Sequence, residues 1–350
     1  MLTYTNPIVQ RDLQEICSRI DTAAFDGKTI LVTGANSMLG TYMAYLFLYM
    51  ADKLGLDVRT VVLTRSADKT RALYADFIGR EYFGIIDSDI THTIAYDGPL
   101  DYIYHFAGNA SPRFINTDPV GILQSNLTGT FNVMELAREK KARVIFASTR
   151  EVYGALDLPQ LSEHTFGSLD PMDNRSCYPE SKRAAESILR AYHLQHGVES
   201  ISARIAHCYG PGMKTDNDGR VMADFIGDAI SGRDITLNSS GDAVRAFCYI
   251  SDATTALALL AIKGESGTAY NLSNESEPLP IREIARIICE CCDRHRIEVR
   301  FSGRQSQAGY CTYRRVALDN SRLTALGFIP MVSLREGITR TLKSFEYDRQ

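Results

Sequence analysis

Two residues capable of acid–base chemistry, Tyr178 and Lys182, lie four positions apart in the segment Tyr-Pro-Glu-Ser-Lys. On a helix this spacing puts both side chains on one face. A lysine ammonium beside a phenol favours the phenolate, so we expect Lys182 to lower the pKa of Tyr178 from about 10 towards that of a working general base. Such a base can take the proton of a sugar or alcohol hydroxyl while a nicotinamide takes the hydride. The spacing alone arises often by chance, so it is informative only beside a dinucleotide-binding turn.

A turn of that kind lies upstream, after the apolar run 28–33, and reads Gly34-Ala-Asn-Ser-Met-Leu-Gly40. Gly34 and Gly40 open a helix whose first N–H groups and dipole favour a pyrophosphate. The usual middle glycine is a serine here, which weakens the fingerprint and leaves a simple strand-to-helix turn as the alternative. The residues predicted to bind the coenzyme at this turn are Gly34, Ser37, Met38, Leu39 and Gly40.

Three further places are predicted to contact the coenzyme. An acidic residue usually ends the second strand and binds the adenosine ribose, but this chain has Thr-Arg65-Ser there. Arg65 either clamps a 2′-phosphate, which would indicate NADP, or stacks on adenine, or is a solvated loop residue. The other two places are Asp89 with Ile90, at the adenine edge, and Phe106, Ala107 and Gly108, where the coenzyme would pass close to the backbone.

Bulk properties describe an ordinary globular protein. The chain has 350 residues, 45% of them hydrophobic and 23% charged, and a formal net charge of −4. This charge gives no reason to expect a nucleic-acid or membrane partner. The longest apolar run, Met43 to Ala51, is about half of a bilayer span and suggests a buried helix. No secretory signal is visible, so we expect a cytoplasmic protein.

Eight cysteines are scattered through the chain, and without an export signal they favour reduced thiols. The cluster Cys289, Cys291, Cys292 and His295 invites a metal interpretation. Paired Cys-x-x-Cys knuckles are missing, however, and the cysteines continue the helical spacing of the preceding isoleucines. We therefore expect a core stripe and no metal.

The order of predicted elements indicates an α/β fold with a doubly wound parallel sheet. Strands are expected at 28–33, 58–64, 83–86, 102–106, 143–147, 200–205 and 269–272, and helices at 6–22, 68–80, 118–140, 178–196, 221–231 and 281–294. The predicted organisation is a helical extension (1–27), a Rossmann domain (28–206, with a returning part near 237–272) and a smaller substrate-binding lobe (207–236 and 273–350). The substrate is expected in the cleft between them.

Over residues 28 to 340 the chain resembles the extended short-chain dehydrogenase/reductase family, specifically its nucleotide-sugar epimerases, dehydratases and decarboxylases. The resemblance rests on Gly34 to Gly40, His105 to Gly108, Ala147 to Gly154, Tyr178 with Lys182, Arg204 to Pro211, Arg245 to Asp252, and Arg315 to Asp319. The segments around Ser111, Glu151, Arg220 and Arg245 are most similar to UDP-glucuronate decarboxylases.

The resemblance implies roles for four residues. Tyr178 would be the base at the sugar 4-hydroxyl, Lys182 its electrostatic partner and a ribose contact, and Thr149 a ligand of the same oxygen. Hydride transfer from C4 to NAD⁺ would give a 4-keto sugar. The next step would depend on Glu151 and its neighbours.

Arg150 departs from the family pattern. Dehydratases carry an Asp-Glu pair where this chain has Arg150-Glu151, which makes dehydration a weaker expectation. Decarboxylases usually have a serine at this position. Arg150 either pairs with a C6 carboxylate through its planar fork or, since neighbours on a strand face opposite ways, points away from Thr149.

The resemblance also implies substrate contacts. Arg220, Arg245 and Arg315 match positions that hold or adjoin the nucleotide diphosphate, and surface ion pairs are the alternative. His207 occupies the place of an asparagine that contacts substrate in relatives, or else is a core histidine. Ser111, Arg150, His207, Arg220, Arg245 and Arg315 are therefore the predicted substrate-binding residues.

The leading hypothesis is an NAD-dependent enzyme of the UDP-glucuronate decarboxylase type, of the kind used in polysaccharide biosynthesis. A 4-epimerase or 4,6-dehydratase is the alternative. Two readings from other classes are a non-catalytic NAD(P)-binding module and an NADPH-dependent carbonyl reductase. The family commonly forms homodimers through two helices, here 118–140 and 178–196.

Overall fold

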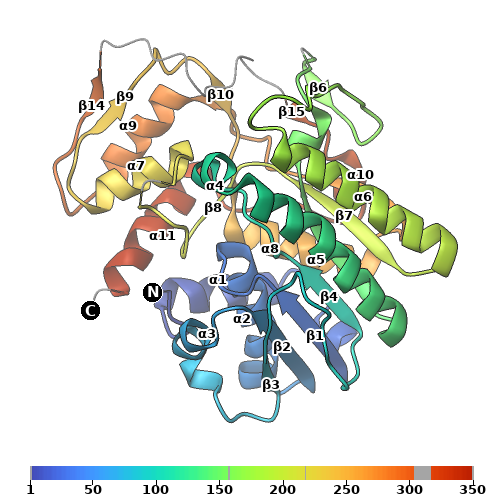
Figure 1. The fold of residues 1–350 in the computed structure, drawn as a ribbon. Coiled ribbons are helices and arrows are strands. Elements are labelled where there is room, and N and C mark those ends of the chain that lie inside the picture. Colours follow the sequence, from blue (N-terminus) through green and yellow to red (C-terminus); the bar gives the residue numbers. More distant parts are fainter. Residues whose placement is uncertain (1, 157, 217, 303–316, 349–350) are drawn as a thin grey trace.

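The computed structural model describes residues 2–156, 158–216, 218–302 and 317–348. Its centre is a seven-stranded parallel sheet with the order β12-β7-β5-β4-β1-β2-β3 (Figure 1). The strands are β1 Lys28–Thr33, β2 Val58–Thr64, β3 Phe83–Asp87, β4 Tyr102–His105, β5 Arg143–Thr149, β7 Ser200–Ile205 and β12 Thr268–Leu272. The prediction of a doubly wound parallel sheet is confirmed.

Both faces of this sheet are buried, because the side chains of each strand alternate between two layers of helices. Ile30 and Val32 of β1 face one core, together with α2 Met38–Leu54 and α8 Ile250–Lys263. Leu31 faces the other core, beneath α5 Pro119–Lys140 and α6 Cys177–His196. Tyr178 and Lys182 belong to α6 and therefore lie on this second face of the sheet.

The remaining elements surround this framework. The other helices are α1 Pro7–Cys17, α3 Ala67–Leu73, α4 Pro112–Thr117, α7 Val221–Ile230, α9 Ile281–Cys291, α10 Ser321–Ala325 and α11 Leu334–Tyr347. Short strands form four pairs: β6 Gln160–Leu161 with β15 Ala317–Leu318, β8 Cys208–Tyr209 with β11 Cys248–Tyr249, β9 Ile235–Leu237 with β14 Val299–Phe301, and β10 Val244–Arg245 with β13 Leu279–Pro280. Helices α7, α9 and α11 gather with β9 and β14 at one end of the molecule (Figure 1). The lobe boundaries drawn from the sequence stay a prediction.

Several element bounds differ from those expected. The helix expected at 68–80 stops at Leu73 and continues as a 3₁₀ turn, Ala75–Phe77. Tyr74 interrupts it, because its ring is buried and its hydroxyl donates to the carbonyl of Ala35 at 2.7 Å. Helix α9 ends at Cys291 rather than 294, and its innermost residues are Ile284 and Ile288. The thiols of Cys289, Cys291 and Cys292 at this helix end are partly buried and form no disulfide.

The apolar run from Met43 to Ala51 lies in α2, and seven of its nine residues are buried. It is therefore core rather than membrane segment. Among the residues that the structure describes, no helix combines the length and hydrophobicity needed to cross a bilayer.

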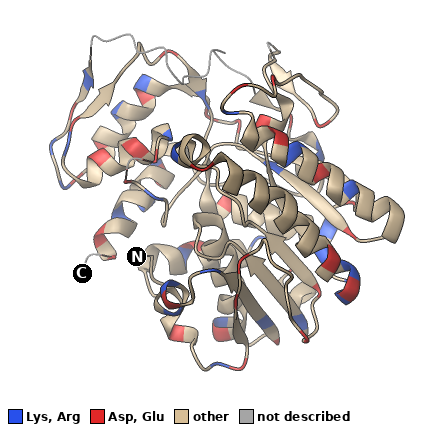
Figure 2. Cartoon of the chain, viewed as in Figure 1, with Lys and Arg blue, Asp and Glu red and all other residues tan. Residues whose placement is uncertain are grey.

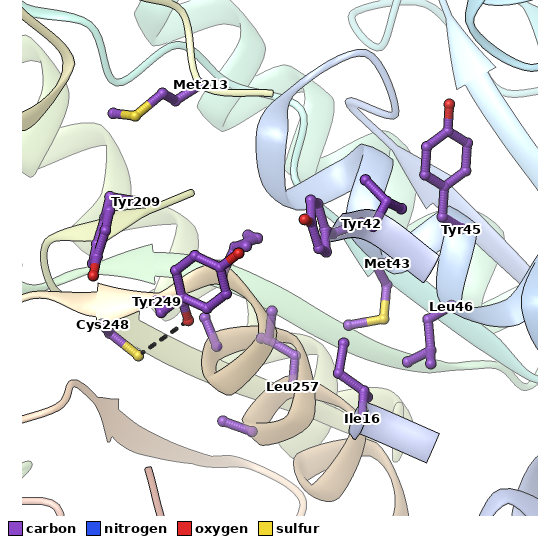
Figure 3. Packing of buried hydrophobic residues seen from close by; sticks show 14 of the residues in the cluster. Ile16, Tyr42, Met43, Tyr45, Leu46, Tyr209, Met213, Cys248, Tyr249 and Leu257 are labelled. Carbon is purple, nitrogen blue, oxygen red and sulfur yellow. Dashed lines mark hydrogen bonds between the residues drawn. The ribbon is translucent and has the colours of Figure 1, made fainter. Parts of the chain in front are cut away.

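The N-terminal segment is built into the core by one buried carboxylate. Asp12 of α1 accepts hydrogen bonds from Tyr42 of α2 at 2.9 Å and Tyr249 of β11 at 2.7 Å. Arg340 of α11 donates to the other carboxylate oxygen at 2.7 Å. Ile16, one turn further along α1, joins the cluster drawn around α2 and α8 (Figure 3). Asp12 thus ties four separate segments together.

Replacing Asp12 with alanine is expected to lower the free energy of unfolding by about 2–4 kcal/mol, because the buried hydroxyls of Tyr42 and Tyr249 lose their acceptor, while Arg340 keeps its pairs with Glu15 and Glu336. Urea denaturation followed by circular dichroism measures this. Arg11→Ala is the matched control, since Arg11 pairs with Glu15 and Glu336 at the surface and should cost about 0–1 kcal/mol. Equal losses for the two variants would contradict the assignment.

Candidate functional site

The glycine turn closes over the bend that follows β4. Gly34 has φ +67°, and a Cβ there would lie 2.7 Å from the carbonyl carbon and oxygen of Phe106. A Cβ on Gly40 would lie 2.3 Å from the carbonyl oxygen of Gly34. Both positions therefore demand glycine. The tight packing brings Gly34, Gly40, Phe106 and Ala107 together, as predicted for a dinucleotide site.

Ser37 is the N-cap of α2, and its Oγ accepts from the N–H of Gly40 at 3.2 Å. Its hydroxyl therefore supports the helix end. Met38 and Leu39 are the first two helical residues, whose N–H groups have no partner inside a helix. These N–H groups and the positive end of α2 fit the pyrophosphate of a dinucleotide. The side chains of Met38 and Leu39 pack against the core.

The end of β2 lies beside the loop after β3. Arg65 is mostly exposed, and its guanidinium lies 3.8 Å from the carboxylate of Asp89. Asp89 accepts from both the N–H and the hydroxyl of Thr91, and these bonds hold its pKa below the usual value. Ile90 is buried and packs on Gly129 of α5. The structure thus brings Arg65, Asp89 and Ile90 to one edge of the turn.

Lys182 is buried one helical turn after Tyr178. Its Nζ donates to the carbonyl of Ala147 at 2.8 Å and lies 4.5 Å from the centre of the Phe146 ring. Burial lowers the pKa of Lys182 to about 7, although Glu186 opposes the shift. A Cβ on Gly108, which has φ +149°, would lie 3.6 Å from Nζ of Lys182. The backbone at Gly108 therefore lies beside this ammonium.

Tyr178 is also buried, and the pKa expected from its sequence is wrong in direction. Burial and the Glu151 carboxylate raise the pKa of Tyr178 well above 10, while a hydrogen bond from Thr149 and the charge of Arg220 lower it less. Burial therefore outweighs the lowering that the spacing of Tyr178 and Lys182 led us to expect. The structure does bring Thr149, Glu151 and Tyr178 together.

The chain turns sharply after Thr149. This residue ends β5 and caps a 3₁₀ helix, Arg150–Tyr153, with its Oγ1 accepting from the N–H of Glu151 at 3.2 Å. Arg150 therefore lies in the 3₁₀ helix and not in the strand that ends at Thr149. The alternation of side chains along a strand gives no reason for Arg150 to point away from Thr149. Partial desolvation raises the pKa of Glu151, although its side chain stays accessible to solvent, and the charges of Arg175 and Arg150 oppose this rise.

Arg150, His207 and Arg245 line one small pocket that opens to solvent, together with Glu275. Burial and the two guanidinium charges lower the pKa of His207 to about 3. His207 has φ +47°, a conformation that non-glycine residues rarely adopt and that tends to persist at functional sites. Glu275 accepts from the N–H of Leu318 at 3.1 Å. The pocket is cationic and adjoins Thr149 through Arg150.

Ser111 and Arg220 meet at a second edge of the site. The Ser111 hydroxyl donates to the carbonyl of Asp218 at 3.0 Å, and Arg220 is paired with the carboxylate of the same Asp218. Arg220 is near enough to Tyr178 to lower its pKa. Arg315 lies outside the described residues.

Two charged residues in this region were missed. Arg175 precedes Tyr178 by three residues and acts on Glu151, so its proximity to the motif was a usable signal. Glu275 lies in the segment after β12 and lines the pocket. It belongs to no sequence motif that would have predicted this position. Among the described residues, no cluster of three metal-ligating side chains occurs.

The parallel sheet, the glycine turn and the buried residues beside it define the class of Rossmann-type dinucleotide-binding proteins. More particularly, residues 30–273 match the NAD dependent epimerase/dehydratase family, and the chain belongs to that family.

Two relatives that are similar over most of this chain are UDP-glucuronic acid decarboxylases. The chain is 35% identical over 321 residues to UDP-glucuronic acid decarboxylase 1 of Xenopus tropicalis, covering 91% of this chain and 72% of the relative. It is 34% identical to UDP-glucuronic acid decarboxylase 6 of Arabidopsis thaliana, covering 88% and 86%. These similarities span nearly the whole chain, as the resemblance in its motifs predicted.

Solved structures confirm the fold. The UDP-N-acetylglucosamine 4-epimerase of Methanobrevibacter ruminantium superposes with a TM-score of 0.77 at 20% identity, covering 92% of this chain and 99% of that one. The UDP-glucuronic acid 4-epimerase of Bacillus cereus, solved with NAD, gives 0.72 at 20% identity, covering 91% and 96%.

Burial of Lys182 yields a prediction on stability. The unfolded chain keeps this lysine protonated up to about pH 10, while in the folded protein it loses its proton near pH 7. The cost of burying the charge is therefore complete below pH 7 and disappears as pH rises towards 10. Lys182→Met should be more stable than the wild type at pH 7, with the advantage shrinking by about 1.4 kcal/mol per pH unit above it.

Urea denaturation at pH 7, 8 and 9, without added dinucleotide, measures this difference. Lys53→Met, at a half-exposed site, supplies the baseline for removing a surface charge. A difference for Lys182→Met that stayed constant with pH would contradict the burial of an ammonium here.

Proposed function

We propose that this chain is an NAD-dependent enzyme that converts a nucleotide sugar through a 4-keto intermediate, with UDP-glucuronate decarboxylation as its reaction. The observation that carries the proposal is the meeting of Thr149, Glu151, Tyr178 and Lys182 beside the glycine turn, in a chain about one-third identical to UDP-glucuronic acid decarboxylases over nine-tenths of its length. A bound NAD⁺ would supply the hydride acceptor.

The residues of the chain divide the work of the oxidation. Tyr178 takes the proton of the sugar 4-hydroxyl, and Thr149, already hydrogen-bonded to the phenol, orients the same oxygen. Burial raises the pKa of Tyr178, and the charge of Arg220 with the hydrogen bond from Thr149 acts in the direction that favours the phenolate. Burial lowers the pKa of Lys182 to about 7, so this side chain is only partly charged at neutral pH. Lys182 holds the ribose by hydrogen bonding.

The 4-keto product determines the second step. A carboxylate at C6 is then β to a ketone, so its C–C bond breaks with release of CO₂ and the electron pair passes towards the C4 oxygen. Glu151, whose pKa is raised by partial desolvation while its side chain stays accessible, is suited to exchange a proton near C5. Replacement of the dehydratase Asp by Arg150 removes the acid that a leaving 6-hydroxyl needs.

Substrate contacts are proposed for Ser111, Arg150, His207, Arg220, Arg245 and Arg315. Arg150 and Arg245 meet in one pocket, which supports binding of an anionic group there. Arg220 lies on the Tyr178 side of the site. A 4-epimerase remains the second candidate, because the pocket suits a uronic acid whether or not its carboxylate is lost.

The coenzyme proposed is NAD, since the cycle returns the hydride and needs the oxidised form to stay bound. Arg65 keeps NADP in consideration, because its only described ion pair is the long one to Asp89. Competition between NADH and NADPH, followed by nicotinamide fluorescence, decides between them.

A homodimer through α5 and α6 is proposed as the assembly. The outer faces of these helices expose Val120, Leu123, Phe131 and Leu194, and α5 carries its charges near the C-terminal end (Figure 2). Light scattering should give twice the mass of the chain, and a monomer would contradict this proposal. Cytoplasmic location stays a prediction from the sequence.

Incubation with UDP-glucuronate and mass analysis of the product tests the reaction. Decarboxylation removes the mass of CO₂, epimerisation leaves the mass unchanged, and dehydration removes the mass of water. Tyr178→Phe should lower turnover by about 10²–10⁴-fold while still binding dinucleotide, because only the proton acceptor is lost. Tyr347→Phe, an exposed tyrosine of α11, is the control.

Other outcomes point to other classes. Dinucleotide binding without turnover of any nucleotide sugar would indicate a non-catalytic module. Stoichiometric consumption of added NADPH would indicate a carbonyl reductase. A Tyr178→Phe variant with normal turnover would remove the base assignment.

Arg150→Ser is expected to weaken binding of UDP-glucuronate about tenfold or more, and of UDP-glucose much less, because a charge-assisted bond to the carboxylate is lost. Isothermal titration calorimetry with both ligands measures the ratio. Arg150→Lys should fall between the two, since it keeps the charge without the planar fork. Equal losses for both ligands would reject a carboxylate contact.

A further inference from the structure

His105 sits at the centre of a buried chain of hydrogen bonds behind the coenzyme turn. Its Nδ1 lies 2.9 Å from Oγ1 of Thr33, the last residue of β1. Its Nε2 lies 3.2 Å from Oγ1 of Thr130 in α5. All three side chains are fully buried. The imidazole therefore spans from the strand that leads into the glycine turn to a helix on the sheet's second face.

The direction of each bond follows from its backbone ends. Thr33 Oγ1 accepts from the N–H of Ala107 at 3.1 Å, so its own proton is available to His105. Thr130 Oγ1 donates to the carbonyl of Asn126, so its oxygen is available to accept. His105 must then accept at Nδ1 and donate from Nε2–H. The ring is neutral, and burial and the charge of Lys182 lower its pKa to about 3.

The chain continues from Asn126 to the catalytic helix. The Asn126 side-chain amide donates to Ser181 Oγ at 2.9 Å, and the Ser181 hydroxyl donates to the carbonyl of Tyr178 at 2.9 Å. Because the hydroxyl proton of Ser181 is donated to the carbonyl of Tyr178, the Ser181 oxygen can only accept from Asn126. The side-chain nitrogen of Asn126, and not its oxygen, therefore contacts Ser181. Asn126 and Ser181 are both buried.

The two ends of this chain are the two parts of the site. At one end, Ala107 belongs to the bend that packs on Gly34, where no Cβ fits. At the other, Ser181 lies between Tyr178 and Lys182 on α6. Each of the three hydroxyls accepts one hydrogen bond and donates one, so its proton is already committed. In a buried, low-dielectric region such a chain holds its members stiffly.

We propose that His105 is a positioning residue, which registers the coenzyme-binding turn against the Tyr178–Lys182 helix through Thr33, Thr130, Asn126 and Ser181. This inference deepens the proposed function and rests on it, because the distance it sets is that between coenzyme and base. Hydride transfer tolerates little misplacement, and a shift of about 1 Å can cost 10²-fold in rate. His105 itself need not touch coenzyme or substrate.

Thr130→Val tests the proposal, because it keeps the shape of the side chain and removes the acceptor of His105 Nε2–H. NADH affinity, measured by fluorescence titration of the complete protein, should fall about tenfold. Thr130→Ser, which restores the hydroxyl, should bind within about twofold of the wild type. Thr254→Val in α8 is the matched control, since this equally buried threonine also donates to a carbonyl four residues earlier but lies outside the chain.

Ser181→Ala tests the other end independently. It should lower turnover of UDP-glucuronate about tenfold with NADH affinity nearly unchanged, because only the catalytic helix loses its anchor. Equal NADH affinity for Thr130→Val and Thr254→Val, or failure of Thr130→Ser to restore it, would overturn the proposal while the wild type still binds and turns over. A wild type that binds neither NADH nor NADPH would overturn the coenzyme proposal and this inference together.

Discussion

Burial of the Lys182 ammonium is the constraint on which the site depends. A charge removed from water needs partners, and here the carbonyl of Ala147 and the face of Phe146 are the ones that β5 supplies. The same strand ends at Thr149, which bonds the phenol of Tyr178. Helix α6 and the end of β5 are therefore fitted to each other at both catalytic side chains, and neither can shift without exposing or stranding a polar group.

The sequence was sufficient to predict whatever is specified by a local pattern. The strand before Gly34, the glycine turn and the α6 spacing of Tyr178 with Lys182 each have a short-range signature, and the parallel sheet follows from their alternation. The 3₁₀ turn at Arg150 could not be foreseen, because the cap that starts it, Thr149, reads equally well as a strand residue. The raised pKa of Tyr178 was missed for a similar reason, since burial is a property of the assembled fold and outweighs the neighbouring charge.

Two departures from the family pattern, Arg150 and His207, proved to be neighbours. Separated by more than fifty positions in the chain, they line one pocket, and the guanidinium helps to keep the imidazole neutral. By the resemblance in the motifs, Arg150 stands where decarboxylases usually have a serine, and His207 stands where relatives have an asparagine. The two positions therefore form one surface of the same pocket rather than two unrelated sites.

The two ends of the described chain meet. Thr3 and Asn6 hydrogen-bond to Asp348, and Asn6 also donates to the carbonyl of Ser344. The ribbon shows both ends beside α11 (Figure 1). Because so little separation has to be bridged, a short linker could join them, and new ends could be opened in the exposed stretch 78–81 that precedes β3. A circularly permuted chain of this kind would retain the order of strands in the sheet and the site. Only the order of the elements along the chain would change.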